Sequence, residues 1–105
     1  MTVRLDPPAL AMVWPGVGEA HRAVTVASAD LLPGEALVEV ELATICGSDL
    51  HTVSGRRAGP APGVLGHEIV GRVGRLGVGP PPRDVRGRPV EIGDRVAVGI
   101  YASCG

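Results

Sequence analysis

Glycine and proline interrupt almost the whole chain, and this feature limits what the chain can fold into. Sixteen glycines and ten prolines make up 26 of the 105 residues. Only residues 19–32 and 35–46 form stretches of a dozen or more without either type. Because both types end or bend regular elements, the elements between them must be short. Valine, leucine and isoleucine number 29 of 105, above the level of about 20% below which a core fails. A folded, turn-rich, aliphatic domain is expected.

Alternating apolar and polar residues predict strands in both uninterrupted stretches. Residues 36–42 place three apolar side chains on one side and two glutamates on the other, which is the period of a half-buried strand. The side expected to be buried carries Val38, Val40 and Leu42. Residues 22–26 also alternate, although their alanines leave a helix open. Pro33 and Gly34 lie between the two stretches as a turn signal, so the simplest interpretation is a hairpin.

The second half of the chain reads as further short strands. Residues 69–76 predict a strand with glycines at bends or close approaches. Residues 77–89, with three successive prolines, predict a loop, and a brief extended piece at 90–92 follows it. The chain then resumes as a strand at 95–100. Together with one or two helical turns expected at 46–53, this spacing predicts an all-β barrel or sandwich.

Charge and hydropathy exclude several classes of partner. Ten arginines, no lysine and eleven acidic residues give a net charge of −1, so no broad basic surface exists for nucleic acid. No run of about 18 apolar residues is present to span a bilayer. Asp6, Pro7 and Pro8 interrupt the segment where a secretory signal needs an apolar stretch. We expect a cytoplasmic protein with no nucleic-acid or membrane partner and with its two cysteines reduced.

Cys46, His67 and Glu68 form the constellation with the most chemical content. Zinc prefers thiolate, imidazole and carboxylate ligands, and a catalytic site uses three of them plus water. Cys46 ends a predicted strand and opens a predicted helical turn, where backbone N–H groups favour the thiolate. His67 and Glu68 begin the next strand, so all three are candidates to meet at one rim of a barrel. By spacing alone, a buried thiol and a hydrogen-bonded imidazole explain the same residues.

The residues that follow Cys46 suggest a route for protons. On a helical turn, Ser48 and His51 stand three residues apart and share a face. A hydroxyl beside a metal site, backed by an imidazole that releases protons to water, forms a proton relay. The alternative is that Ser48 or Asp49 is a helix cap and His51 a solvated loop residue. Asp49 has a second role open to it, accepting a hydrogen bond from a ligating imidazole.

Four short motifs occur together in this order: CGSDLH at 46–51, GHE at 66–68, GDRV at 93–96 and SCG at 103–105. With them the sequence resembles, from about Met12 to its last residue, the N-terminal catalytic domain of zinc-dependent medium-chain alcohol dehydrogenases. The resemblance implies a GroES-like, partly open β-barrel. It also implies an alcohol or carbonyl compound as the small-molecule substrate, with Zn²⁺ and NAD(P) as cofactors.

The resemblance assigns roles to single residues. Cys46 and His67 would ligate the catalytic zinc, and Glu68 would be a nearby carboxylate that is a direct ligand in some branches. Ser48 and His51 would pass the alcohol proton to solvent, while zinc stabilises the alkoxide from which a nicotinamide takes hydride. A further cysteine, Cys104, would be the first of four in a structural zinc lobe.

The sequence also departs from the family pattern. The other structural cysteines, a later zinc ligand and a G-x-G-x-x-G fingerprint are absent from residues 1–105, and the loop at 77–89 is longer than usual. We therefore expect an incomplete GroES-like domain without its nucleotide-binding domain, inactive as an isolated chain. The alternative is a non-enzymatic GroES-like interaction module, or the relic of a truncated gene. A homo-oligomer is a candidate assembly, and a disulfide between Cys46 and Cys104 is disfavoured in a reducing cytosol.

Overall fold

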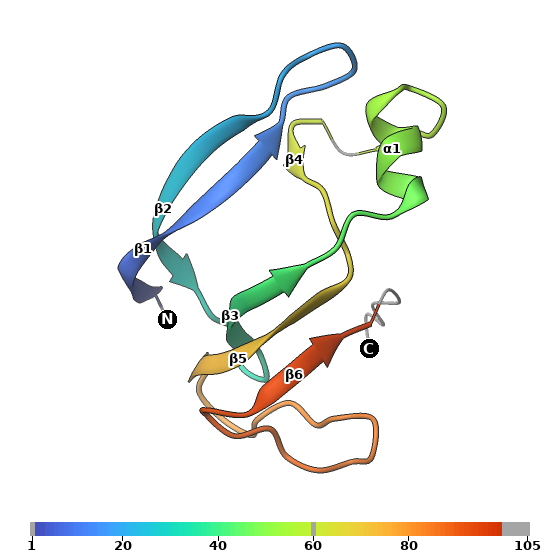
Figure 1. The fold of residues 1–105 in the computed structure, drawn as a ribbon. Coiled ribbons are helices and arrows are strands. Elements are labelled where there is room, and N and C mark those ends of the chain that lie inside the picture. Colours follow the sequence, from blue (N-terminus) through green and yellow to red (C-terminus); the bar gives the residue numbers. More distant parts are fainter. Residues whose placement is uncertain (1, 60, 100–105) are drawn as a thin grey trace.

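The computed structural model describes residues 2–59 and 61–99, which form two antiparallel sheets and one short helix (Figure 1). The elements are β1 (Thr2–Trp14), β2 (Arg22–Asp30), β3 (Ala36–Ala43), α1 (Gly47–Val53), β4 (Gly63–Val64), β5 (Ile69–Leu76) and β6 (Arg95–Val98). The strand order is β2-β1-β4 in one sheet and β3-β5-β6 in the other. The predicted all-β class is therefore confirmed. No helix in the described residues has the length and apolar character needed to cross a bilayer.

Most predicted elements occur where the sequence places them. The strands expected at 36–42 and 69–76 are β3 and β5, and the expected helical turns are α1. Residues 22–26 lie inside the strand β2, which rules out the helix left open for them. Strand β6 begins at Arg95 as expected but ends at Val98, and residue 100 lies outside the described residues.

The predicted hairpin between β2 and β3 is wrong. The turn at Pro33 and Gly34 does form: Glu35 N–H donates to the Leu32 carbonyl at 3.1 Å, and Gly34 has a φ of 82°. However, β2 pairs with β1, whereas β3 pairs with β5. The turn therefore carries the chain from one sheet to the other. A local turn signal says that the chain reverses, but it does not say which edge the next strand joins.

Strand β1 was not expected, because Pro7 and Pro8 interrupt it. Proline has no N–H for a ladder and is confined to edges and bulges. The register accommodates both prolines: Arg4 pairs with Ser28 and Ala9 with Val26, so four residues of β1 face a single residue of β2. This bulge leaves the two prolines out of the ladder while the strand continues on either side.

The brief extended piece expected at 90–92 is not a strand. Instead, an isolated bridge joins Arg83 to Pro89, and Val90 N–H donates to the Pro82 carbonyl at 2.9 Å. The predicted loop at 77–89 thus folds back on itself, because its own backbone groups satisfy one another. It packs beside the β3-β5-β6 sheet, where Val85 and Val90 help to line a cavity of about 430 Å³.

The burial expected for β3 is also wrong in part. Val38 is half-buried, but Val40 and Leu42 are 57% and 60% exposed. The strand contacts run mainly within each sheet, so no described element covers this part of β3. The fully buried apolar side chains are few, with Trp14 and Val73 the largest. The fold among the described residues is a partial barrel with an uncovered apolar face.

Glycine in β5 has the close-approach role that the sequence predicts. A Cβ built on Gly71 would lie 2.3 Å from the carbonyl oxygen of Glu39 on the paired strand β3. Any larger residue at this position would push β3 and β5 apart. Because β3 leads into Cys46 and β5 follows His67, this close pairing also holds the two halves of the site together.

Candidate metal centre

Cys46 stands at the junction between β3 and α1. Its backbone is extended (φ −113°, ψ 171°), and it caps the helix that begins at Gly47. Three residues later, Asp49 turns its carboxylate back and accepts a hydrogen bond from the Cys46 N–H at 3.1 Å. This is the reach of an N3 carboxylate in a capping box, which satisfies an otherwise unpaired donor. The local sequence therefore fixes where the thiol of Cys46 emerges from the chain.

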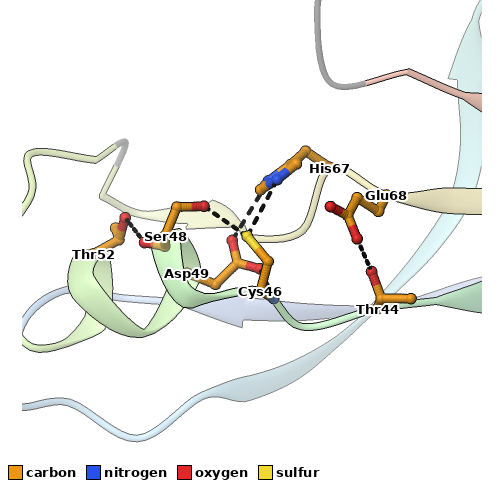
Figure 2. A network of polar contacts seen from close by, with 7 residues as sticks. All are labelled: Thr44, Cys46, Ser48, Asp49, Thr52, His67 and Glu68. Atoms are coloured by element: carbon orange, nitrogen blue, oxygen red, sulfur yellow. Dashed lines mark hydrogen bonds and ion pairs between the residues drawn. The ribbon is translucent and has the colours of Figure 1, made fainter.

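The thiol meets an imidazole from the segment before β5. Cys46 Sγ lies 3.3 Å from His67 Nε2, although the residues are 21 positions apart (Figure 2). Both are half-buried. The sulfur also contacts the Ser48 hydroxyl, with 2.8 Å between Sγ and Oγ. Thiol, imidazole and hydroxyl, each singled out from the sequence, therefore lie close together.

Asp49 links the helix to the imidazole. Its Oδ1 lies 3.7 Å from His67 Nδ1, on the side of the ring opposite the sulfur contact. The carboxylate is 15% exposed and the imidazole 35%. A carboxylate at Nδ1 favours the tautomer that leaves Nε2 free as a ligand atom. At 3.7 Å this contact is electrostatic and too long for a hydrogen bond, so the hydrogen-bonding role considered for Asp49 stays a prediction.

Glu68 completes the cluster from an exposed position. One ligand atom from each of Cys46, His67 and Glu68 can be chosen so that all lie within 4.8 Å of one another. The Glu68 carboxylate is held by Thr44, whose hydroxyl donates to Oε2 at 2.6 Å (Figure 2). Sequence reasoning missed Thr44, because its relation to Glu68 appears only when the register of β3 against β5 is known.

The donor set fits a zinc ion. A tetrahedral ion bound to sulfur at about 2.3 Å and to nitrogen at about 2.0 Å holds those atoms roughly 3.5 Å apart. The observed Sγ–Nε2 distance of 3.3 Å is close to that value. The combination of one thiol, one imidazole and one carboxylate is also the chemistry of a borderline-soft divalent cation. Three protein ligands would leave a fourth position open.

A small pocket opens beside this cluster. It has a volume of about 190 Å³ and is lined in part by Ser48, Asp49, Thr52, Arg57 and His67. Thr52 is buried and donates through its hydroxyl to the Ser48 carbonyl at 2.9 Å. This bond ties the floor of the pocket to the first turn of α1. Arg57 was not singled out from the sequence, because nothing in its local pattern distinguishes it from other exposed arginines.

Two residues singled out from the sequence stand apart from this cluster. His51 is exposed on α1, and no hydrogen bond links its imidazole to Ser48 within residues 2–59 and 61–99. Its carbonyl instead receives the N–H groups of Arg56 and Arg57 at the end of the helix. Its relay role stays a prediction. Cys104 lies outside the described residues.

Several known proteins are similar to this chain. A 5-exo-hydroxycamphor dehydrogenase of Pseudomonas putida is 49% identical over 76 residues, which are 71% of this chain and 21% of that protein. A probable alcohol dehydrogenase of Mycobacterium tuberculosis is 41% identical over 70 residues, 67% of this chain and 18% of that protein. A zinc-type alcohol dehydrogenase-like protein of Haemophilus influenzae is 42% identical over 72 residues, 68% of this chain and 19% of that protein.

The chain thus spans about a fifth of the length of these relatives. No solved structure gives a significant match. A family model described as the alcohol dehydrogenase GroES-like domain matches residues 32–105, which contain every residue of the cluster described above. Since that match covers most of the chain, this protein belongs to the alcohol dehydrogenase GroES-like domain family.

Proposed function

We propose that this chain is the zinc-binding N-terminal part of an NAD(P)-dependent alcohol dehydrogenase-like oxidoreductase. The observation that carries the proposal is the 3.3 Å approach of Cys46 Sγ to His67 Nε2, with Glu68 in the same cluster. Family membership alone supports an alcohol dehydrogenase-like N-terminal part. The geometry adds the reason to expect an ion, because a thiol and an imidazole from distant segments already stand at the separation a shared ion requires.

Each residue of the cluster has a role in holding the ion. Cys46 would bind through its thiolate, His67 through Nε2 and Glu68 through a carboxylate oxygen, while the Asp49 carboxylate faces Nδ1 of the ring from 3.7 Å. The Ser48 hydroxyl, at 2.8 Å, is placed to donate to that thiolate. A bound zinc ion would act as a Lewis acid on the substrate oxygen. Ser48 and His67 also line the adjacent pocket, which offers room for a small substrate.

The same residues suggest how the substrate proton leaves. The Ser48 hydroxyl lines the pocket, so it can accept the proton of an alcohol bound there. His51, one helical turn further along α1, is exposed and can release a proton to water. NAD(P)⁺ would supply the hydride acceptor, and the product would be the corresponding carbonyl compound. The substrate class we propose is therefore a small alcohol or carbonyl compound.

We propose this activity for a longer protein that contains the chain. Residues 1–105 include no G-x-G-x-x-G fingerprint for a dinucleotide, and the relatives are about five times as long. By itself the chain is expected to bind zinc without turning over alcohols. Its cytoplasmic location stays a prediction made from the interrupted apolar segments at its N-terminus.

Metal titration of the purified chain tests the proposal. Co²⁺ is the probe, because it replaces zinc at such sites and gives visible absorption bands that depend on its ligands. The wild-type chain should bind one equivalent with a thiolate-to-cobalt charge-transfer band, which Zn²⁺ should displace. Cys46→Ser should lose that band. If the wild-type chain is folded by circular dichroism but binds no Co²⁺, the proposed zinc binding is wrong. If the chain alone oxidises alcohols, the expectation that it is inactive by itself is wrong.

One observation favours a second candidate, a non-enzymatic GroES-like interaction module. Val40 and Leu42 on β3 and Val98 on β6 are between 43% and 60% exposed, and apolar surface of this kind marks contacts with other proteins. Sedimentation of the metal-free chain distinguishes the readings. Stable self-association that persists after loss of the metal site would favour the module, and a monomer that binds one metal ion favours the dehydrogenase part.

A further inference from the structure

We infer that Thr44 is a positioning residue that presents the carboxylate of Glu68 to the ion held by Cys46 and His67. The inference deepens the proposed zinc function and rests on it. It assigns Thr44 a task in deciding whether Glu68 serves as a direct ligand. Three features of the structure support it: the pairing of β3 with β5, two hydrogen bonds between Thr44 and Glu68, and the direction of the free carboxylate oxygen.

The pairing of β3 with β5 brings Thr44 opposite Glu68. The last register pair of these strands is Ala43 with Ile69, so the next pair in an antiparallel ladder is Thr44 with Glu68. The Thr44 N–H indeed donates to the Glu68 carbonyl at 3.1 Å. Directly opposite residues of such a pair point their side chains to the same face. The backbone alone therefore aims the hydroxyl at the carboxylate.

The side chains then form a second bond between the same residues. Thr44 Oγ1 donates to Glu68 Oε2 at 2.6 Å, a short bond of the charge-assisted kind. Figure 2 shows that this bond engages one carboxylate oxygen while the other points toward Cys46 and His67. Cys46 lies two residues beyond Thr44, and side chains at that spacing on an extended chain share a side. One anchored oxygen and one free oxygen suit a carboxylate that binds an ion through a single atom.

The anchor matters because Glu68 is exposed. A free glutamate side chain in water samples many rotamers, and fixing it costs conformational entropy at the moment an ion binds. Thr44 removes part of that cost beforehand, since its hydroxyl already holds one oxygen of the carboxylate. Partners that orient a ligand are typically worth about 10- to 100-fold in metal affinity. For an exposed bond, the lower end of that range is expected.

Co²⁺ affinity of the purified chain, measured by competition with a chelator, tests the inference. Thr44→Val keeps the shape and removes the hydroxyl, and Thr44→Ser restores it. We expect about 10-fold weaker binding for Thr44→Val and a value within about 2-fold of wild type for Thr44→Ser. The bound cobalt should also change its visible spectrum in Thr44→Val to the one seen in Glu68→Ala. A role in folding alone would not move that spectrum.

The double variant separates direct from indirect effects. In a Glu68→Ala chain, adding Thr44→Val should cause no further loss, because Thr44 acts through Glu68. An equal loss in both backgrounds would overturn the inference, as would wild-type affinity and spectrum in Thr44→Val. Should Thr44→Val fail to fold, Thr44→Ala takes its place under the same criteria. Unchanged affinity and spectrum in Glu68→Ala would also overturn the inference. A folded wild-type chain that binds no Co²⁺ would overturn the proposed zinc function as well. If the wild-type chain does bind Co²⁺, a negative result in Thr44→Val overturns only the role of Thr44.

Discussion

Two aspartates in this protein perform the same local task, yet only one belongs to a candidate site. Asp49 accepts a hydrogen bond from the backbone N–H of Cys46, three residues before it. Asp84, in the loop at 77–89, accepts hydrogen bonds from the backbone N–H groups of Arg86 and Arg88 at 2.8 and 3.0 Å. Both carboxylates thus stabilise a tight local conformation by satisfying backbone donors.

The difference lies in what else each carboxylate meets. Among the described residues, every hydrogen-bond partner of Asp84 lies within four residues of it, and the side chain is exposed. The backbone N–H of Arg88 is the main cause that lowers the pKa of Asp84 below its ordinary value of 3.8. Asp49 instead also faces His67, from a segment 18 positions away. A chemical site arises where a local turn is brought against a remote segment.

The largest effect on zinc affinity should follow loss of a ligand at the contact between Cys46 and His67. Cys46→Ser or His67→Ala should each weaken zinc binding by more than about 100-fold, beyond what loss of an orienting partner costs. The melting temperature of the metal-free chain should change little, because none of the three cluster residues is fully buried. Chelator competition measures the zinc affinity, and thermal melting measures the stability of the metal-free chain. Retained full zinc occupancy in Cys46→Ser would remove Cys46 from the ligand set.

A smaller effect should follow at Asp49. Asp49→Asn keeps an oxygen that can accept from the Cys46 N–H but removes the charge that faces His67. Zinc affinity should fall by about 10-fold while the helix signal in circular dichroism stays constant. Asp49→Ala is the matched comparison, since it also removes the backbone bond. If Asp49→Asn binds zinc like wild type, the contact with His67 has no role in the metal centre.

The equivalent change at Asp84 should lower the stability of the fold without changing zinc affinity. Asp84→Ala should lower the melting temperature near neutral pH, with zinc affinity within about 2-fold of wild type. A carboxyl whose pKa is lowered on folding stabilises the protein above its unfolded-state pKa. That contribution disappears as the pH falls through the folded-state pKa. The gap between wild type and Asp84→Ala should therefore close on acidification below 3.8. A gap that persists in acid would contradict this account.

The smallest effect on the metal is expected at His51. Its imidazole is exposed and outside the cluster, so His51→Ala should leave zinc affinity within about 2-fold of wild type. In a longer protein with turnover, the same change should slow alcohol oxidation, because an exposed proton acceptor is lost. Strong loss of metal in His51→Ala would show that the imidazole reaches the ion, against the relay role.

Much of the site was accessible from the sequence because its information is local. The CGSDLH motif predicted a helical turn opening at Cys46, and α1 does begin directly after it. The predicted strand, however, ends at Ala43 and not at Cys46, and Asp49, considered as a helix cap, instead reaches back to the Cys46 N–H. The position of His67 directly before β5 was equally readable. Thr44 was not, because an ordinary threonine acquires a role only through the register that sets it opposite Glu68.

The same distinction applies to the fold: its local features could be predicted from the sequence, and its strand pairing could not. Alternation identified β3 and β5, since the period of side chains along a strand is a local property. The same alternation suggested a hairpin of β2 with β3, and the tertiary structure instead assigned β2 to β1 and β3 to β5. Alternation also predicted burial for Val40 and Leu42, whose side chains are exposed. A sequence pattern records which side of a strand is apolar, but the neighbouring elements determine whether that side is covered.

The sequence by itself determined the chemical identities in this protein: a thiol at the start of a helical turn, an imidazole and a carboxylate before a strand, and short elements between glycines and prolines. Only the tertiary structure decided that Cys46 and His67 stand 3.3 Å apart and that Thr44 holds Glu68. The physical reason is that hydrogen bonding within a turn depends on neighbours in the chain. Strand pairing, by contrast, depends on which distant edges meet, and no local pattern encodes that choice.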